Sequence, residues 1–332
     1  MVGCPYVHSL PVPSMKKKSR PAVSSENQLT TKTRFWTTVR EFFPRADALR
    51  EVFDARFSRP FELEGRFVWD YWHVPGQYTY FRTQAREFFP ADLFQELQNA
   101  IASWGREHLG CEATTSPWLS YYVDGCRQEL HTDSPHGPWA FVFSLTPWRD
   151  RTFSGGETLL MSPEVLSYWR NWEQFSRGLH HRQIFTALDA EFNQLTVFDP
   201  RLPHGVAPVF GTRDPRRGRL VLHGWFTPPR IRWNGSLGAE SLAPVLRALA
   251  AKLGRELAGR EPATGLLIFD LLIEATGRVQ KVAICTNTVV SLADDQKSVA
   301  EILTALVELL TGVRFPRSNG RTNLVLPLQL GN

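Results

Sequence analysis

Helical periodicity dominates the chain from about residue 35 to residue 110. In the segment FFPADLFQELQNAIASWGREHL, apolar residues recur at spacings of four, four and three, at Leu93, Leu97, Ile101 and Trp104. This spacing places the side chains on one face of a helix, and Pro90 is well suited to the start of that helix. We therefore expect an amphipathic helix whose apolar face packs against the rest of the domain.

The pattern changes between about residues 117 and 230, where short apolar runs alternate with Gly, Pro and Asp. Five of these runs are strand-like: WLSYYV, WAFVFSL, GETLLM, NQLTVF and RLVLHGWF. Short strands separated by turn residues are typical of a sandwich or a barrel-like roll. The stretch SPEVLSYWRNWEQFSRG interrupts them, and the spacing of its apolar residues predicts a helical insert, with Val165, Trp169, Trp172 and Phe175 as the apolar positions.

The remaining sequence divides into three parts around a main domain at 33–230. Residues 1–32 are rich in Pro and Ser and lack the continuous apolar core of a secretory signal, so we expect a disordered tail, with Met15 as an alternative start. The Ala-, Leu- and Arg-rich segment 231–262 predicts a linker helix. Residues 263–332 follow the order strand, turn, strand, helix, strand, which predicts a separate small αβ domain.

Composition narrows the class of protein. The net charge is +5, and the 11 Trp and 22 Phe residues are typical of β-rich cores or aromatic-lined pockets. No apolar run is long enough to span a membrane. The 4 cysteines form no CxxC pattern, which favours a reducing, cytoplasmic compartment. We interpret the densest basic cluster, GTRDPRRGR, as a solvated hairpin tip, so nucleic acid is not an expected partner.

A candidate metal site lies in ELHTDSPHGPW (129–139). His131 and Asp133 are two residues apart, so on an extended strand both side chains would point to the same face. An imidazole and a carboxylate are two members of the 2-His-1-carboxylate triad that binds Fe(II) and leaves the other coordination positions open. The best candidate for the third ligand is His204, which follows the strand-like run Leu195 to Phe198. His136 follows too soon in a Pro/Gly turn to be preferred.

The last strand-like run contains a candidate anion site. In RLVLHGWF, alternation places Arg219, Val221, His223 and Trp225 on one face of the strand. A guanidinium on such an apolar face is costly to bury without an anion, and its planar fork suits a carboxylate. Arg219 is therefore the candidate carboxylate-binding residue, with a surface ion pair at a strand end as the simpler interpretation.

These motifs, taken in order, resemble those of the prolyl 4-hydroxylase-type 2-oxoglutarate- and Fe(II)-dependent dioxygenases. The resemblance rests on four motifs: YYVDGCRQELHTD, SGGETLLM, FDPRLPHGVAPV and RLVLHGWF. The stretch from the first motif to the last spans about 110 residues. Gly125 precedes His131 by six residues, as in the family pattern, and Arg219 precedes the aromatic Trp225 by six.

The resemblance implies an α+β protein built on a double-stranded β-helix, or jelly roll, with flanking helices. Fe(II) would be held by His131, Asp133 and His204, and Arg219 would bind 2-oxoglutarate, with Tyr122 as a hydrogen-bond partner and Trp225 in the pocket wall. The implied reaction hydroxylates an unactivated C–H, with O₂ as cosubstrate, succinate as a product and ascorbate as a reductant. A prolyl or other amino-acid residue of a peptide or protein is the expected substrate, with a natural product or modified peptide as the alternative.

Several interpretations stay open beside this one. Arg219 follows His204 at a spacing of fifteen residues, more than the family pattern suggests, so Arg217 is a second candidate for the cosubstrate arginine. A nucleic-acid demethylase of the AlkB type would share the triad, but it would carry a second arginine where this chain has Trp225. The chain could also be an inactive roll that acts as a binding or scaffold protein, or a metal-binding roll that uses no 2-oxoglutarate.

The C-terminal segment has a resemblance of its own. FDLLIEATGRVQKVAIC and AEILTALVELLTGVRFPRSNGRTNLVLPLQL resemble the C-terminal domain of TonB and related proteins. The shared features are the hairpin at Gly277 to Val279, a helix, the VRFP motif and a final strand. This implies a protein-contacting or self-associating module at 263–332, and the simpler interpretation is a small unit that only packs on the roll.

Overall fold

The structure, a computed structural model, describes residues 35–58, 69–170, 173, 178–180, 183–258, 260, 262–291 and 296–331. The tail predicted at 1–32 lies outside the described residues, as do Trp172 and Phe175 of the predicted insert. The described part of that insert forms α4 (Glu164–Arg170), in which Trp169 is 79% exposed.

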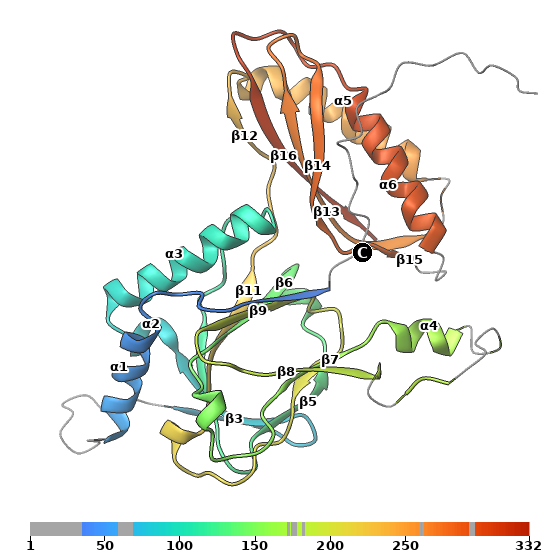
Figure 1. Cartoon of the computed structure of the whole chain (residues 1–332). Coiled ribbons are helices and arrows are strands. Elements are labelled where there is room, and N and C mark those ends of the chain that lie inside the picture. The colour runs from blue at the N-terminus through green and yellow to red at the C-terminus, as the bar shows by residue number, and fades with distance from the viewer. Residues whose placement is uncertain are drawn as a thin grey trace, which may run out of the picture. The chain divides into compact units, whose positions relative to one another are not determined.

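Eight strands of the main domain form two runs within one antiparallel sheet that curls round on itself (Figure 1). One run has the order β9-β6-β11-β4, with β9 (Gln194–Phe198), β6 (Trp139–Ser144), β11 (Arg219–Phe226) and β4 (Trp118–Tyr122). The other has the order β5-β10-β7-β8, with β5 (Arg127–His131), β10 (His204–Val206), β7 (Thr158–Met161) and β8 (Phe185–Leu188). Along the chain the strands pass back and forth between the two runs, which is the topology of a jelly roll. The structure thus confirms the predicted roll.

The region at 35–110 contains strands as well as the expected helices. The helices are α1 (Ala46–Ser58), α2 (Ala85–Phe88) and α3 (Ala91–His108), and the strands are β1 (Trp36–Val39), β2 (Asp70–Val74) and β3 (Tyr78–Gln84). The helical periodicity of this region gave no indication of β3, which pairs with both β4 and β5 and joins the two runs of the roll. The alternation of Tyr78, Tyr80 and Arg82 with Thr79 and Phe81 is the local signal for this strand.

The predicted apolar face of α3 packs in the main core. Leu93, Leu97 and Ile101 are buried there together with Leu220 and Leu222 from one face of β11. The helix begins after Pro90, as the sequence predicts. Because β11 buries one face in this core, its other face is left for the interior of the roll.

The C-terminal segment forms a second sheet with the order β12-β16-β13-β14. Its elements are β12 (Arg232–Gly235), α5 (Ala239–Leu257), β13 (Ala263–Ile273), β14 (Val279–Asn287), β15 (Val290–Ser291), α6 (Gln296–Thr311) and β16 (Thr322–Leu330). Leu242 and Leu249 of α5 belong to the core of this sheet, and β12 pairs with β16. The expected linker region therefore contributes a strand and a helix to the C-terminal unit.

Direct contacts join this unit to the main domain. Ile268 is buried in the core that contains α3, and a Cβ at Gly110 would lie 2.7 Å from it. The Thr286 hydroxyl donates a hydrogen bond of 2.7 Å to the Leu109 carbonyl.

Within the described residues, no helix combines the length and the apolar character needed to cross a bilayer.

Two adjacent glycines form the turn that leads into β7. Gly155 and Gly156 have φ values of +77° and +82°, a left-handed conformation that glycine adopts without steric cost. A Cβ at Gly155 would lie 1.8 Å from the Pro208 carbonyl oxygen, whereas one at Gly156 would approach the Arg219 side chain at 3.4 Å. The glycine pair thus allows β7 and the segment after β10 to approach closely beside Arg219.

Replacing Gly155 by Ala should destabilise the roll. We expect the free energy of unfolding to fall by roughly 1–3 kcal/mol for the strained backbone alone, before the clash with Pro208 is added. Denaturant unfolding followed by circular dichroism measures this change. Gly254→Ala is the matched control, since Gly254 lies within α5 and a Cβ there meets nothing within 4 Å. Equal stability of the Gly155 variant and the wild type would contradict this account of the turn.

Candidate active site

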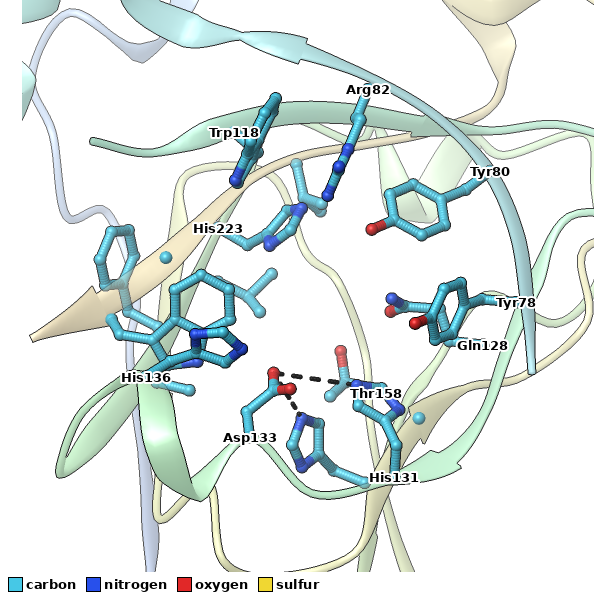
Figure 2. A pocket seen from close by; sticks show the side chains of 18 of the residues that line it. Tyr78, Tyr80, Arg82, Trp118, Gln128, His131, Asp133, His136, Thr158 and His223 are labelled. Atoms are coloured by element: carbon cyan, nitrogen blue, oxygen red, sulfur yellow. Dashed lines mark ion pairs between the residues drawn. The ribbon is translucent and has the colours of Figure 1, made fainter. Parts of the chain in front are cut away.

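The pairing of β5 with β10 brings the two predicted histidine ligands together. His131 and His204 are direct partners across the antiparallel pair, and their ring centroids are 4.5 Å apart. Asp133 Oδ2 lies 3.8 Å from His131 Nε2 and 3.5 Å from His204 Nε2 (Figure 2). Potential ligand atoms of the three residues all lie within 4.8 Å of one another.

The backbone around Asp133 differs from the extended strand that the spacing suggested. β5 ends at His131, and Asp133 has φ −116° and ψ 25° at the start of a short 3₁₀ turn, Ser134–His136. Its amide donates a hydrogen bond of 2.9 Å to the Pro200 carbonyl. The carboxylate therefore reaches the histidines because the chain bends after β5.

Hydrogen bonds to the backbone orient both imidazoles. The Nδ1 of His131 lies 2.8 Å from the Glu129 carbonyl, and the Nδ1 of His204 lies 2.9 Å from the Leu202 carbonyl. Because a carbonyl can only accept, each Nδ1 carries the proton and each Nε2 presents a lone pair toward Asp133. Two Nε2 atoms and one carboxylate fit the 2-His-1-carboxylate donor set for Fe(II).

The electrostatics of these groups favour metal binding over proton binding. Burial lowers the pKa of His131, which keeps its imidazole neutral and available as a ligand. Burial alone would raise the pKa of Asp133, but the interactions with the neighbouring histidines, His204 above all, outweigh it, so this pKa is lowered. Both shifts hold the side chains in the protonation states that coordinate a cation.

Arg219 is the most deeply buried charged side chain of the site. It begins β11, is 1% exposed, and its Nη2 donates a hydrogen bond of 3.1 Å to the Thr158 hydroxyl. Its Nε is buried without a hydrogen-bond partner, and none of the ion pairs found between described residues includes Arg219. Burial lowers the pKa of Arg219 because the charged form loses its hydration. The site thus holds a buried guanidinium whose charge no ion pair among the described residues balances.

Of the other predicted cosubstrate residues, Tyr122 lies beside this guanidinium, whereas Trp225 lies near the other end of β11. The centre of the guanidinium of Arg219 is 4.7 Å from the ring centroid of Tyr122, whose hydroxyl donates to the Gln128 side chain at 3.1 Å. Trp225 lines the same cavity and stacks on His136 at 4.5 Å between ring centroids. Arg217, the second candidate arginine, lies on an exposed 3₁₀ turn outside the residues that line the cavity.

One cavity of about 450 Å³ inside the roll is lined by the triad, by Arg219 and by Tyr122 and Trp225. Figure 2 shows this cavity with His131 and Asp133 labelled. The predicted alternation along β11 is confirmed, since Arg219, Val221, His223 and Trp225 line the cavity while Leu220 and Leu222 lie in the core. Sequence reasoning missed the opposite wall, which β3 provides through Tyr78, Tyr80 and Arg82, with Trp72 and Trp118 beside them. The Tyr-x-Tyr-x-Arg alternation after the turn at Gly76 was the available signal.

His223 is a partly buried imidazole that the ligand set does not include. Its Nε2 lies 2.9 Å from the Ser120 hydroxyl. Burial, together with the charge of Arg219, lowers its pKa to about 3. This histidine is therefore neutral at physiological pH and adds no positive charge to the cavity.

Comparisons with known proteins give a consistent but distant set of structures. Neither the scan against protein-family models nor the search of curated proteins found a match. A prolyl-4-hydroxylase from Pseudomonas putida is 17% identical, with a TM-score of 0.40, and the match covers 60% of this chain and 95% of that one. The collagen prolyl hydroxylase of Paramecium Bursaria Chlorella virus-1, a 2-oxoglutarate complex, is 12% identical, with a TM-score of 0.37 and coverage of 58% and 95%.

HygX from Streptomyces hygroscopicus, with nickel and 2-oxoglutarate bound, is a further similar structure. It is 10% identical, with a TM-score of 0.38, and the match covers 61% of this chain and 86% of that one. At such identities and scores these similarities do not assign the chain to a family. The function is therefore inferred from the site itself.

Removing a histidine of the triad should abolish metal binding. We expect His204→Ala to lower the affinity for Fe(II) by more than about 100-fold, since even changes to residues that only orient metal ligands cost 10- to 100-fold. Anaerobic calorimetry with Fe(II) measures this change. His108→Ala is the control, because His108 lies on the exposed side of α3. Full retention of Fe(II) affinity in the His204 variant would contradict the ligand assignment.

The partly buried His223 should make stability depend on pH. Its pKa is about 3 in the folded protein against an ordinary value of 6.5, so between these values only the unfolded chain takes up the proton. The free energy of unfolding should therefore fall as the pH drops from 6.5 to 3, and His223→Gln should make this fall shallower by up to one proton. Urea unfolding at a series of pH values tests this. Identical slopes in variant and wild type would contradict the shift.

Proposed function

We propose that this protein is a 2-oxoglutarate- and Fe(II)-dependent dioxygenase that hydroxylates an unactivated C–H bond. The observation that carries the proposal is the presence, in one cavity, of the His131–Asp133–His204 donor set and of Arg219 as a buried guanidinium lacking an ion pair among the described residues. A metal-binding roll without 2-oxoglutarate would need the first feature but not the second.

The triad would bind the metal, and Arg219 would bind the cosubstrate. The two Nε2 atoms and the Asp133 carboxylate would hold Fe(II), which when bound supplies the activation of O₂. Arg219 would bind the distal carboxylate of 2-oxoglutarate, oriented by Thr158 and by the ring of Tyr122. The balanced reaction consumes R–H, O₂ and 2-oxoglutarate and releases R–OH, succinate and CO₂. The walls of the roll exclude water from the reacting groups.

The finer parts of the proposal concern the substrate and the setting. A prolyl or other amino-acid residue remains the first substrate class that we propose, and the aromatic side chains lining the cavity support a compact, partly apolar substrate. Ascorbate as a reductant and a cytoplasmic location are proposed from the sequence alone. For 263–332 we propose a TonB-like contact module, and the hydrophobic core that this segment forms with α5 supports it.

Replacing Arg219 should weaken cosubstrate binding selectively. Removing one partner of a buried charge pair costs several kcal/mol, so Arg219→Ala should raise the 2-oxoglutarate concentration needed for half-saturation by roughly 30-fold or more. The measurement is an anaerobic titration of the Fe(II)-loaded protein, followed by the charge-transfer absorption of the chelate. Arg217→Ala, at an exposed position two residues away, is the matched control and should behave like the wild type.

The outcomes of this titration separate the candidate functions. Absence of the absorption band in folded, iron-loaded wild type would overturn the dioxygenase assignment and favour a scaffold protein. A band that responds equally in the Arg219 and Arg217 variants would move the cosubstrate role to another residue.

A further inference from the structure

A second guanidinium, that of Arg82, lines the cavity on a different strand from Arg219. Arg82 lies on β3, and its head points into the cavity near Tyr80 and His223 (Figure 2). The centre of its guanidinium is 3.7 Å from the ring centroid of Trp72 and 4.1 Å from that of Trp118. Two indoles thus cover its faces, which holds the side chain in place and leaves its edge as the donor surface.

The structure leaves this guanidinium short of a counter-charge. Its side chain is 16% exposed, and its Nε is buried without a hydrogen-bond partner. Asp70 is the acidic partner found for it among the described residues, at 4.0 Å from Nε, and that carboxylate side chain is 54% exposed. A contact at that distance is longer than a hydrogen bond, so an exposed Asp70 compensates little of the cost of burying Arg82.

The charged residues that line the cavity also leave Arg82 without a counter-charge. Among the described residues that line it, Arg82 and Arg219 are the guanidinium groups and Asp133 is the one carboxylate. If 2-oxoglutarate binds as proposed, its C1 carboxylate is used at the metal and its distal carboxylate at Arg219. Arg82 is then left with no anionic partner from either the described cavity wall or the cosubstrate.

We infer that Arg82 binds a carboxylate of the primary substrate, so that the molecule to be hydroxylated is a small carboxylic acid, such as a free amino acid or an N-substituted one. This inference rests on the proposed function and narrows its substrate class. The slot between Trp72 and Trp118 admits a planar carboxylate edge-on to the guanidinium, which is the bidentate geometry that arginine favours. The cavity of about 450 Å³ must also hold 2-oxoglutarate, which favours a compact acid over a folded protein surface.

The remaining walls suit the apolar body of such an acid. Tyr80 is 4% exposed, and burial raises the pKa of its hydroxyl, with Arg82 only partly offsetting the shift. Trp225 and His136 line the same cavity, with their ring centroids 4.5 Å apart. An acid anchored at Arg82 would extend between these aromatic groups toward the triad, which would present one of its C–H bonds to the metal site.

The test uses full-length wild type, Arg82→Gln, Arg82→Lys and the control Arg86→Gln. Arg86 lies four residues further along the chain, on the exposed side of α2, where it pairs with Glu87. Each protein is loaded anaerobically with Fe(II) and 2-oxoglutarate until the absorption band is saturated. It is then titrated with four pairs of an acid and its matched amide: L-proline and L-prolinamide, N-acetyl-L-proline and its amide, the dipeptide glycyl-L-proline and its amide, and benzoate and benzamide. The readouts are the shift of the band and the change in tryptophan fluorescence.

We expect the acids to bind wild type at least about tenfold more tightly than the matched amides, because one charge-assisted hydrogen-bonded pair contributes a gain in affinity of about that size. The preference should disappear in Arg82→Gln, stay intermediate in Arg82→Lys and remain complete in Arg86→Gln. Arg82→Lys keeps the charge and most of the stem, so it covers the case in which the Gln variant does not fold. A preference confined to glycyl-L-proline would place the carboxylate at a peptide C-terminus, and one shared by the single amino acids would place it on a free acid.

Different results would overturn the inference. Equal binding of acids and amides, or binding of neither, in wild type that shows the absorption band excludes a carboxylate site at Arg82. A loss of 2-oxoglutarate affinity in Arg82→Gln as large as that in Arg219→Ala would make Arg82 part of the cosubstrate site instead. If the band is missing from wild type, the proposed function fails, while the fluorescence titration of the metal-free protein still decides whether Arg82 selects acids.

Discussion

The antiparallel pairing of β5 with β10 is the contact on which the site depends. It sets His131 directly opposite His204, and the bend after β5 then returns Asp133 to the same point. A shift of one residue in this register would turn one imidazole to the other face of the sheet, because side chains alternate along a strand. The triad is therefore a consequence of how the roll closes, and its precision comes from the flanking strands that hold β5 and β10 in place.

The same roll makes it physically feasible to bury charge. A guanidinium with 1% exposure and no paired carboxylate among the described residues would destabilise an isolated strand, but Arg219 is held by Thr158 and by the ring of Tyr122 within a packed apolar layer. The free energy lost by desolvating this guanidinium is offset by the apolar burial in the cores on either side of the sheet. Binding an anion at Arg219 would recover much of this cost and would therefore stabilise the roll.

Strand β11 shows how fold and site share one element. One of its faces supplies Leu220 and Leu222 to the main core, and the other supplies Arg219 and His223 to the cavity. The polar residues on the second face are tolerated because each has a specific neighbour, such as Ser120 for His223. The opposite wall comes from β3, so the two guanidinium groups are presented by different strands and can bind different molecules.

Local patterns in the sequence indicated the helix at α3 and five strands of the roll, β4, β6, β7, β9 and β11, and they supplied the candidate ligand and arginine positions. These features depend on alternation, helical spacing and short motifs, which act within a few residues. The β3 wall was missed because this strand depends on pairing with β4 and β5, which lie further along the chain than the helical periodicity of its own region. Motif spacing and alternation already favoured His204 over His136 and Arg219 over Arg217. Burial and strand register, which depend on residues far apart in the chain, then place His204 opposite His131 and bury Arg219. The sequence by itself thus determined which chemical groups are present and in what order. Only the tertiary structure decided which of them meet in one cavity, because strand pairing and burial are set by the whole chain.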